Sequence, residues 1–215
     1  MNLNILFDLD GTLLDSTNAI VGTCFEVFKL KNFNVKISED DVKETIGYPL
    51  EIMFEKLGAS PVQALDFMLE YKKIYRQISL SQTYLLPFAI EALEEARNVA
   101  RLAIVTTKTG AYTEPLLKHL QIDHFFEVLI GREHVQNPKP HPEPILLAME
   151  TLGIKNRQNT WMIGDTKLDL ISAKEANIKS AGVLSGYGKR SDLELFSSHI
   201  FNHSLDAVKF IKNNF

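Results

Sequence analysis

Short apolar runs alternate along most of this sequence with longer amphipathic stretches, and this alternation constrains the fold more than any other feature. The runs have the length and β-branched content of strands, and the stretches between them place apolar residues at helical spacing. A chain that repeats strand and helix in this order forms an α/β domain. We therefore expect a doubly wound, mainly parallel sheet. Its expected strands span residues 3–7, 102–106, 128–130, 160–163 and 180–184, and its expected helices span 91–100, 112–120, 144–152 and 168–176.

Residues 16–83 interrupt the alternation, because they contain helix-like stretches and no convincing strand. We expect a helical domain inserted here into an α/β core formed by residues 1–15 and 84–215. Ser38, which acidic residues follow, is the expected N-cap of one inserted helix. Both connections to the insertion are expected to lie at the carboxyl end of the first strand. The helix-like stretches are 19–31, 39–46, 50–57 and 62–79.

Composition and charge exclude several classes of protein. Hydrophobic residues make up 45% and charged residues 23% of the chain, as in ordinary globular proteins. The formal net charge of -4 argues against a nucleic-acid partner, and no run approaches the roughly 18 apolar residues of a membrane span. The single cysteine, Cys24, excludes an internal disulfide, and the residues before Asp8 lack the charged-then-apolar pattern of a leader, so secretion is not expected. We expect a cytoplasmic protein without a membrane partner, whose sequence does not specify an oligomeric state.

Polar residues follow the expected strands at their carboxyl ends, where open α/β sheets bind their ligands. Two carboxylates, Asp8 and Asp10, come directly after the first apolar run. Residues with hydroxyl, ammonium or carboxylate groups follow three later runs. The whole set is Asp8, Asp10, Gly11, Thr12, Thr106, Thr107, Lys108, Lys139, Asp165 and Asp169.

The carboxylates of this set predict a magnesium site. Asp8 and Asp10 alternate on an extended strand, so their side chains share one side and their Cα atoms lie about 6.5–7 Å apart. Such a pair repels, and one member keeps its proton unless a cation lies between them. Asp165 adds an acid from another strand, and Asp169 would share its face if a helix has begun. Oxygen ligands without nearby His or Cys suit Mg²⁺ together with a substrate phosphate.

Partners for that phosphate are present in the same set. Lys139 is a compact cation, and Thr106 offers a hydroxyl beside backbone N–H groups. Each feature alone has a simpler interpretation: "DG" is a common turn, Thr106 fits a strand, and "NPKPHP" fits a stiff loop whose X-Pro bonds are of undetermined isomer. Lys108 is equally consistent with the site and with solvent. Their joint occurrence at strand ends favours a functional interpretation.

The stretches "DLDGT", "IVTTK", "NPKPHP" and "GDTKLD" resemble, in this order, the four motifs of the haloacid dehalogenase superfamily. The resemblance covers the whole chain. The inserted helices are similar to the cap of its phosphoglycolate phosphatase and β-phosphoglucomutase relatives. Two positions depart from the usual pattern: Thr107 stands where many relatives have Asn, and Asn177 stands where many have a helix-ending Gly. Asn also tolerates a left-handed conformation, so that ending is expected to survive.

The resemblance implies a Mg²⁺-dependent phosphomonoester hydrolase. Asp8 would be the nucleophile that forms an aspartyl-phosphate, and Asp10 would be the general acid and then the general base. Mg²⁺ would be held by Asp8, the backbone carbonyl of Asp10 and Asp165. Asp169 would either bind the ion directly or contact it through a ligand of the ion. The residues assigned to the phosphoryl oxygens are Thr106, Thr107 and Lys139.

The substrate implied is a small phosphorylated metabolite, with phosphoglycolate as the family-level expectation. Nucleoside monophosphates, sugar phosphates and pyrophosphate remain open. A cap is expected to close over the site and exclude water. Thr12, Gly47 and Tyr48 are expected to face the substrate.

Three alternatives can be compared on particular residues. Dehalogenase relatives lack the second acid, Asp10, because they protonate no leaving alcohol. Phosphosugar mutases of the superfamily have an arginine after a glycine in the cap loop, where "IGYPLEI" has Leu50. A phospho-accepting receiver-type signalling module also combines acids, Thr and Lys on a doubly wound sheet. It would, however, have the acidic pair and the acceptor Asp on different strands, and no insertion.

Overall fold

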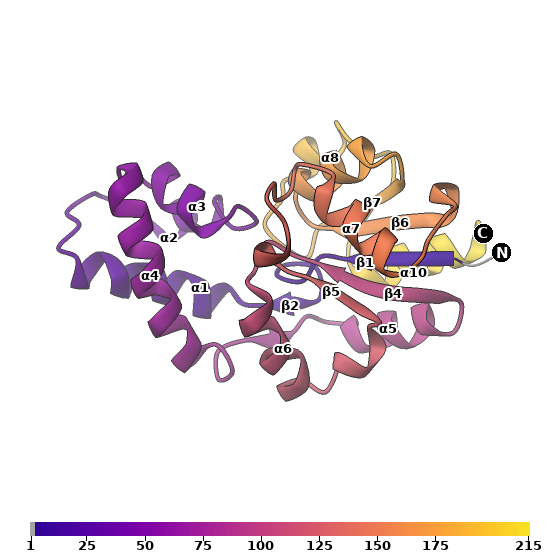
Figure 1. The fold of residues 1–215 in the computed structure, drawn as a ribbon, viewed down its shortest axis with the longest axis horizontal. Coiled ribbons are helices and arrows are strands. Elements are labelled where there is room, and N and C mark those ends of the chain that lie inside the picture. Colours follow the sequence, from indigo (N-terminus) through magenta and orange to yellow (C-terminus); the bar gives the residue numbers. More distant parts are fainter. Residues whose placement is uncertain (1–2) are drawn as a thin grey trace. The chain divides into compact units, whose positions relative to one another are not determined.

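A computed structural model describes residues 3–215, and the chain divides into two compact units (Figure 1). One unit consists of the segment up to Asp15 together with Leu85–Phe215. The other unit consists of Ser16–Tyr84. Within residues 3–215, no helix is both long enough and apolar enough to cross a membrane.

A six-stranded parallel sheet organises the first unit, in the strand order β5-β4-β1-β6-β7-β8. This confirms the α/β architecture that the alternation of strand and helix predicts. β1 is central and pairs in parallel with β4 on one side and β6 on the other. The strands are β1 (Leu3–Phe7), β4 (Ala100–Val105), β5 (Val128–Ile130), β6 (Thr160–Gly164), β7 (Lys179–Val183) and β8 (Ile200–Phe201).

The register of the three central strands gathers their carboxyl ends at one edge of the sheet. Phe7, the last residue of β1, lies opposite Ile104 of β4 and Ile163 of β6. Because the strands are parallel and end almost level, the residues that follow them emerge together. Asp8 continues the pairing for one more step, since its backbone N–H donates to the carbonyl of Ile163 at 2.9 Å.

Helices cover both faces of this sheet (Figure 1). All of β1 is buried, as expected of a parallel strand covered on both sides. Its alternate side chains enter two cores: Ile5 and Phe7 pack with α5, α6 and α10, and Leu6 packs with α7 and α8. These helices are α5 (Ala89–Arg97), α6 (Gly110–His119), α7 (Glu143–Thr151), α8 (Lys167–Glu175) and α10 (Ser204–Asn213).

The Ser16–Tyr84 unit is helical and has an aromatic core of its own. Phe54 contacts Phe28, Phe67 and Tyr71 edge-to-face, with ring centroids 5.5–6.1 Å apart. Ser38 forms the capping box of its second helix, which confirms the predicted N-cap. The helices are α1 (Thr17–Leu30), α2 (Glu39–Lys43), α3 (Leu50–Lys56) and α4 (Pro61–Ile78).

Several short elements have no counterpart in the predicted set. β2 (Leu14–Asp15) and β3 (Tyr84–Leu85) form a two-stranded sheet where the chain leaves and re-enters the first unit. Beyond β7 the chain adds β8 and α10, whose Leu205 and Val208 complete one of the sheet's cores. The remaining helical segments are α9 (Arg190–Leu193) and the 3-10 turns Asp123–Phe125, Arg132–His134 and Arg157–Asn159.

Candidate active site

The turn after β1 packs tightly against Asp165. Gly11 has a φ of +85°, and a Cβ there would lie 2.4 Å from Oδ2 of Asp165. Only glycine fits a position that combines this backbone conformation with so close an approach. The next residue, Thr12, donates its hydroxyl to Oδ1 of Asp165 at 3.1 Å. The "DGT" sequence therefore brings the first strand's acids against the acid that follows β6.

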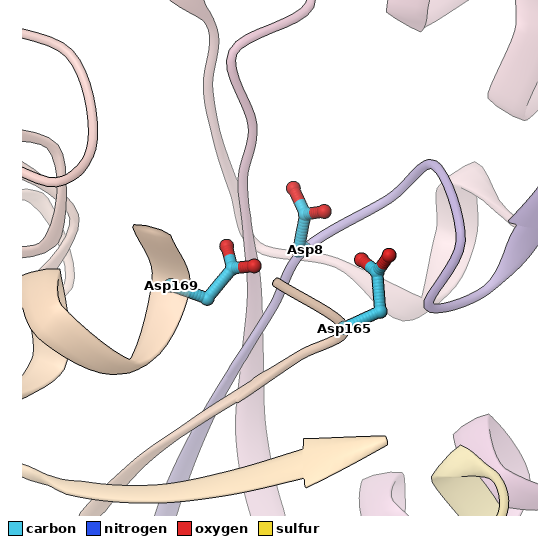
Figure 2. A group of neighbouring side chains, drawn as sticks. All are labelled: Asp8, Asp165 and Asp169. Atoms are coloured by element: carbon cyan, nitrogen blue, oxygen red, sulfur yellow. The ribbon is translucent and has the colours of Figure 1, made fainter. Parts of the chain in front are cut away.

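Three carboxylates meet at this edge of the sheet (Figure 2). Asp8 follows β1, Asp165 follows β6, and Asp169 lies in the first turn of α8. Each contributes an oxygen that lies within 4.8 Å of the other two, and all three side chains are buried. Figure 2 shows the three side chains near one another, with their carboxylates directed to the same side.

Lys139 supplies a buried ammonium to this cluster. Its Nζ lies 2.7 Å from Oδ1 of Asp8 and 2.9 Å from the carbonyl oxygen of Val105, and it also contacts Oδ1 of Asp169. Three acceptors match the three donors of an ammonium group. The peptide bond between Lys139 and Pro140 is cis, which settles the isomer of this X-Pro bond.

Asp169 is oriented by the start of α8. Thr166 is the N-cap, and both its backbone N–H and its hydroxyl donate to Oδ2 of Asp169, at 3.0 and 2.7 Å. The helix begins at Lys167, so Asp165 precedes it and cannot share a helical face with Asp169. The two acids meet because a capping box turns Asp169 back toward the end of β6.

Burial and mutual repulsion make this carboxylate cluster costly to ionise. Burial, with the charges of Asp169 and Asp10, raises the pKa of Asp8 to about 7, although Lys139 opposes the shift. Burial and the two neighbouring acids hold the pKa of Asp165 well above its usual range. Burial alone would lower the pKa of Lys139, but Asp169 and Asp8 outweigh it, so the ammonium keeps its charge.

The charge and chemistry of the cluster fit a divalent cation. Three carboxylates and one ammonium leave two negative charges when all are ionised. Buried charges of one sign require compensation, and oxygen donors without nitrogen or sulfur ligands are those that Mg²⁺ takes.

Asp10 lies beside a second lysine rather than in this cluster. Its Oδ2 is 3.0 Å from Nζ of Lys108, and the two side chains are only 13% and 8% exposed. Its Oδ1 is buried and has no hydrogen-bond partner among residues 3–215. Of the two orientations open to Lys108, the structure has the one directed at the acid.

Thr106 and Thr107 begin the loop that carries Lys108. Thr106 is buried, and its backbone N–H donates to the carbonyl of Ile130 at 2.9 Å. Its hydroxyl oxygen accepts from the backbone N–H of Lys108 at 3.2 Å. Thr107 is half-buried, on the stretch between β4 and α6.

Residues after β5 hold the same loop from its other side, which sequence reasoning missed. Glu133 accepts the backbone N–H groups of Gly110 and Ala111, at 2.8 and 3.1 Å, and so completes the N-terminus of α6. The backbone N–H of Arg132 donates to the carbonyl of Lys108 at 3.0 Å. No local sequence signal connects a glutamate to a helix start 23 residues earlier in the chain.

The loop after β7 was also missed, and it encloses Asp165. The backbone N–H of Tyr187 donates to Oδ2 of Asp165 at 2.8 Å. A Cβ on Gly186 would lie 2.1 Å from that oxygen, and one on Gly188 would lie 2.1 Å from the carbonyl oxygen of Asp165. The sequence signal that could have indicated this loop is the glycine pair of "SGYG", directly after an expected strand.

Two further residues of the expected site belong to the helical unit. Gly47 has a φ of +103°, in the left-handed region that favours glycine. The ring of Tyr48 has Nζ of Lys56 4.5 Å from its centroid. These contacts lie within the Ser16–Tyr84 unit.

Comparison with known proteins gives a consistent result. The model of a family described as haloacid dehalogenase-like hydrolase matches residues 5–183. A phosphoglycolate phosphatase from Colwellia psychrerythraea is 32% identical, over 95% of this chain and 96% of its own. The pyrophosphatase PpaX from Oceanobacillus iheyensis is 30% identical, over 98% of this chain and 97% of its own.

A solved structure has the same fold along nearly its whole length. It is a hydrolase of the haloacid dehalogenase-like family from Streptococcus pneumoniae, 29% identical in sequence. The likeness has a TM-score of 0.87 and covers 97% of this chain and 98% of that one.

Proposed function

The chain belongs to the haloacid dehalogenase-like hydrolases and is a phosphatase, and we propose that it hydrolyses small phosphomonoesters with Mg²⁺ through an aspartyl-phosphate. One observation carries the proposal: three buried carboxylates converge beside Lys139, with a separate acid, Asp10, next to them. A nucleophile, a cation site and a proton donor are the groups that such a reaction requires.

Asp8 is the proposed nucleophile. One of its carboxylate oxygens attacks phosphorus, and an O–P bond to Asp8 forms as the bond to the leaving alcohol breaks. Asp10 gives its proton to the departing oxygen. In the second step Asp10 takes a proton from water, the water oxygen bonds to phosphorus, and the aspartyl-phosphate bond breaks to release inorganic phosphate. The side chains of Asp8 and Asp10 are thereby both restored.

The remaining residues of the site position the phosphoryl group and neutralise its charge. We assign Mg²⁺ to Asp8, the backbone carbonyl of Asp10 and Asp165; when bound, the ion supplies positive charge to the phosphoryl oxygens. Both oxygens of Asp169 already accept hydrogen bonds, from Lys139 and from Thr166. This supports a role for Asp169 in positioning the metal-binding residues rather than in binding the ion directly. The proposed phosphoryl-binding groups are Thr106, Thr107 and Lys139.

Among substrates we propose phosphoglycolate first and pyrophosphate second, since relatives named for each match nearly the whole chain. The helical Ser16–Tyr84 unit is the proposed cap, with Gly47 and Tyr48 as substrate contacts. Leu50, where phosphosugar mutases have an arginine, favours hydrolysis over that alternative. The receiver-type alternative is disfavoured by Asp8 and Asp10 following the same strand.

Phosphate release from a panel of small phosphomonoesters tests this proposal, with Mg²⁺ and with a chelator. Wild type should release phosphate only with the metal, Asp8→Asn should release none, and Asp123→Asn, an exposed control, should match wild type. Absence of Mg²⁺-dependent release from every compound, an aryl phosphate included, would contradict the proposal. Turnover retained by Asp8→Asn would assign the nucleophile elsewhere.

A further inference from the structure

We infer that Lys108 determines substrate specificity, by selecting phosphate compounds whose leaving group carries its own negative charge. The inference rests on the proposed function, because it concerns the leaving-group side of the same site. This charge is a carboxylate or a second phosphate, since an ammonium group attracts either.

The position of Lys108 follows from its contact with Asp10. The proposed proton donor must come within hydrogen-bond reach of the leaving-group oxygen. The ammonium of Lys108 lies 3.0 Å from Oδ2 of Asp10. Two hydrogen-bond lengths in series, with the width of the carboxylate group between them, place this ammonium within about 8 Å of the leaving-group oxygen. An anion two or three bonds beyond that oxygen therefore falls within short Coulomb range of Lys108.

The two lysines of the site stand beside different acids. Lys139 contacts the carboxylates of Asp8 and Asp169, so its charge is matched on the nucleophile's side. Lys108 is paired with Asp10, the acid assigned to the leaving group. A second positive charge beside this acid suits an anion on the part of the substrate that departs.

Lys108 is held in place rather than left to explore solvent. Its backbone N–H donates to the Thr106 hydroxyl, and its carbonyl accepts from the backbone N–H of Arg132. Glu133 fixes the next turn through two more backbone N–H groups. With only 8% of its side chain exposed, the ammonium is weakly screened, which strengthens its attraction for an anion. A preorganised charge of this kind discriminates between ligands without first having to be ordered.

Three phosphomonoesters of nearly equal size separate charge from shape. The leaving group is an anion in phosphoglycolate, neutral in 2-hydroxyethyl phosphate and a cation in phosphoethanolamine. Wild type should have the highest kcat/KM for phosphoglycolate and the lowest for phosphoethanolamine. Pyrophosphate, assayed beside them, distinguishes a second phosphate from a carboxylate as the preferred anion.

Lys108→Met removes the charge and keeps most of the length. It should reduce the ratio of kcat/KM for phosphoglycolate to that for 2-hydroxyethyl phosphate by about 30-fold, the order expected of a partly screened charge pair. Lys108→Arg should retain most of the ratio, and Lys155→Met, an exposed lysine of the same unit, should leave it unchanged.

The outcomes separate this inference from the proposed function. An equal loss for all three esters in Lys108→Met would mean that the lysine acts only through Asp10, and would overturn the inference. A wild type that hydrolyses the three esters equally would also overturn it, without reference to any variant. No Mg²⁺-dependent release from any compound would instead overturn the proposed function on which it rests.

Discussion

Replacing Asp8 by asparagine is expected to stabilise the metal-free protein at neutral pH while it abolishes activity. Asp8 is buried among other acids, and this environment raises its pKa from 3.8 to about 7. The ionised carboxylate is therefore less favourable in the folded protein than in the unfolded chain. Asn has nearly the same shape and cannot ionise, so Asp8→Asn removes this cost.

The sign and size of the effect follow from proton linkage. Between pH 3.8 and about 7 the folded state holds a proton on Asp8 that the unfolded chain has lost, so stability falls as pH rises through this window. Each pH unit below about 7 costs about 1.4 kcal/mol and the cost levels off above that pH, so the loss amounts to about 3 kcal/mol between pH 5 and pH 8. The free energy of unfolding of Asp8→Asn, measured relative to wild type, should rise by about this amount over the same range.

Urea unfolding in the presence of a chelator measures this difference. Trp161 is the only tryptophan and lies in β6, so its fluorescence reports on the α/β unit. Asp123→Asn, an exposed acid of the same unit, should follow the wild-type pH dependence. A difference between Asp8→Asn and wild type that stays constant from pH 5 to pH 8 would refute the inference that burial and neighbouring acids raise the pKa of Asp8.

Three further predictions concern other parts of the structure. Glu133→Gln, which gives up one acceptor at the start of α6, should lower kcat/KM about tenfold, whereas the exposed Glu114→Gln should not. Gly186→Ala would place a Cβ 2.1 Å from Oδ2 of Asp165 and should weaken activation by Mg²⁺. The Mg²⁺ concentration needed for half-maximal activity should rise at least tenfold. Gly22→Ala, with open space around the added Cβ, should leave that concentration unchanged. Burial raises the pKa of the Cys24 thiol to about 12, so its reaction with a disulfide reagent at pH 8 should be slow. The reaction should accelerate in urea as the helical unit unfolds. Fast labelling in native buffer would contradict the burial of Cys24.

The sheet could be predicted because its strands are buried on both faces. β1 is apolar at nearly every position, and the residues that follow it are acids, so both the strand and its functional end are visible in sequence. β8 has only two residues and leaves no comparable pattern. The helix after it does carry a readable signal, since Leu205, Val208 and Ile211 recur at helical spacing.

The site was predictable as a set of residues but not as a set of contacts. Asp169 was expected to share a face with Asp165 if a helix had already begun, but the helix begins only at Lys167, and Thr166 and Asp169 form a capping box that "TKLD" could have indicated. The direction of Lys108 depends on where Asp10 lies in three dimensions, and a long side chain has no local preference that reveals it. Glu133 binds backbone N–H groups from another strand's loop, a pairing that only the fold creates.

Trapping the covalent intermediate tests the central claim most directly. Wild type would be mixed with Mg²⁺ and phosphoglycolate, quenched in acid during turnover, and reduced with borohydride, which converts an aspartyl-phosphate to homoserine. Peptide mass spectrometry should find homoserine at position 8 in wild type, and none at that position when substrate is omitted. An unmodified Asp8 during demonstrated turnover, or homoserine at another aspartate, would contradict Asp8 as the nucleophile.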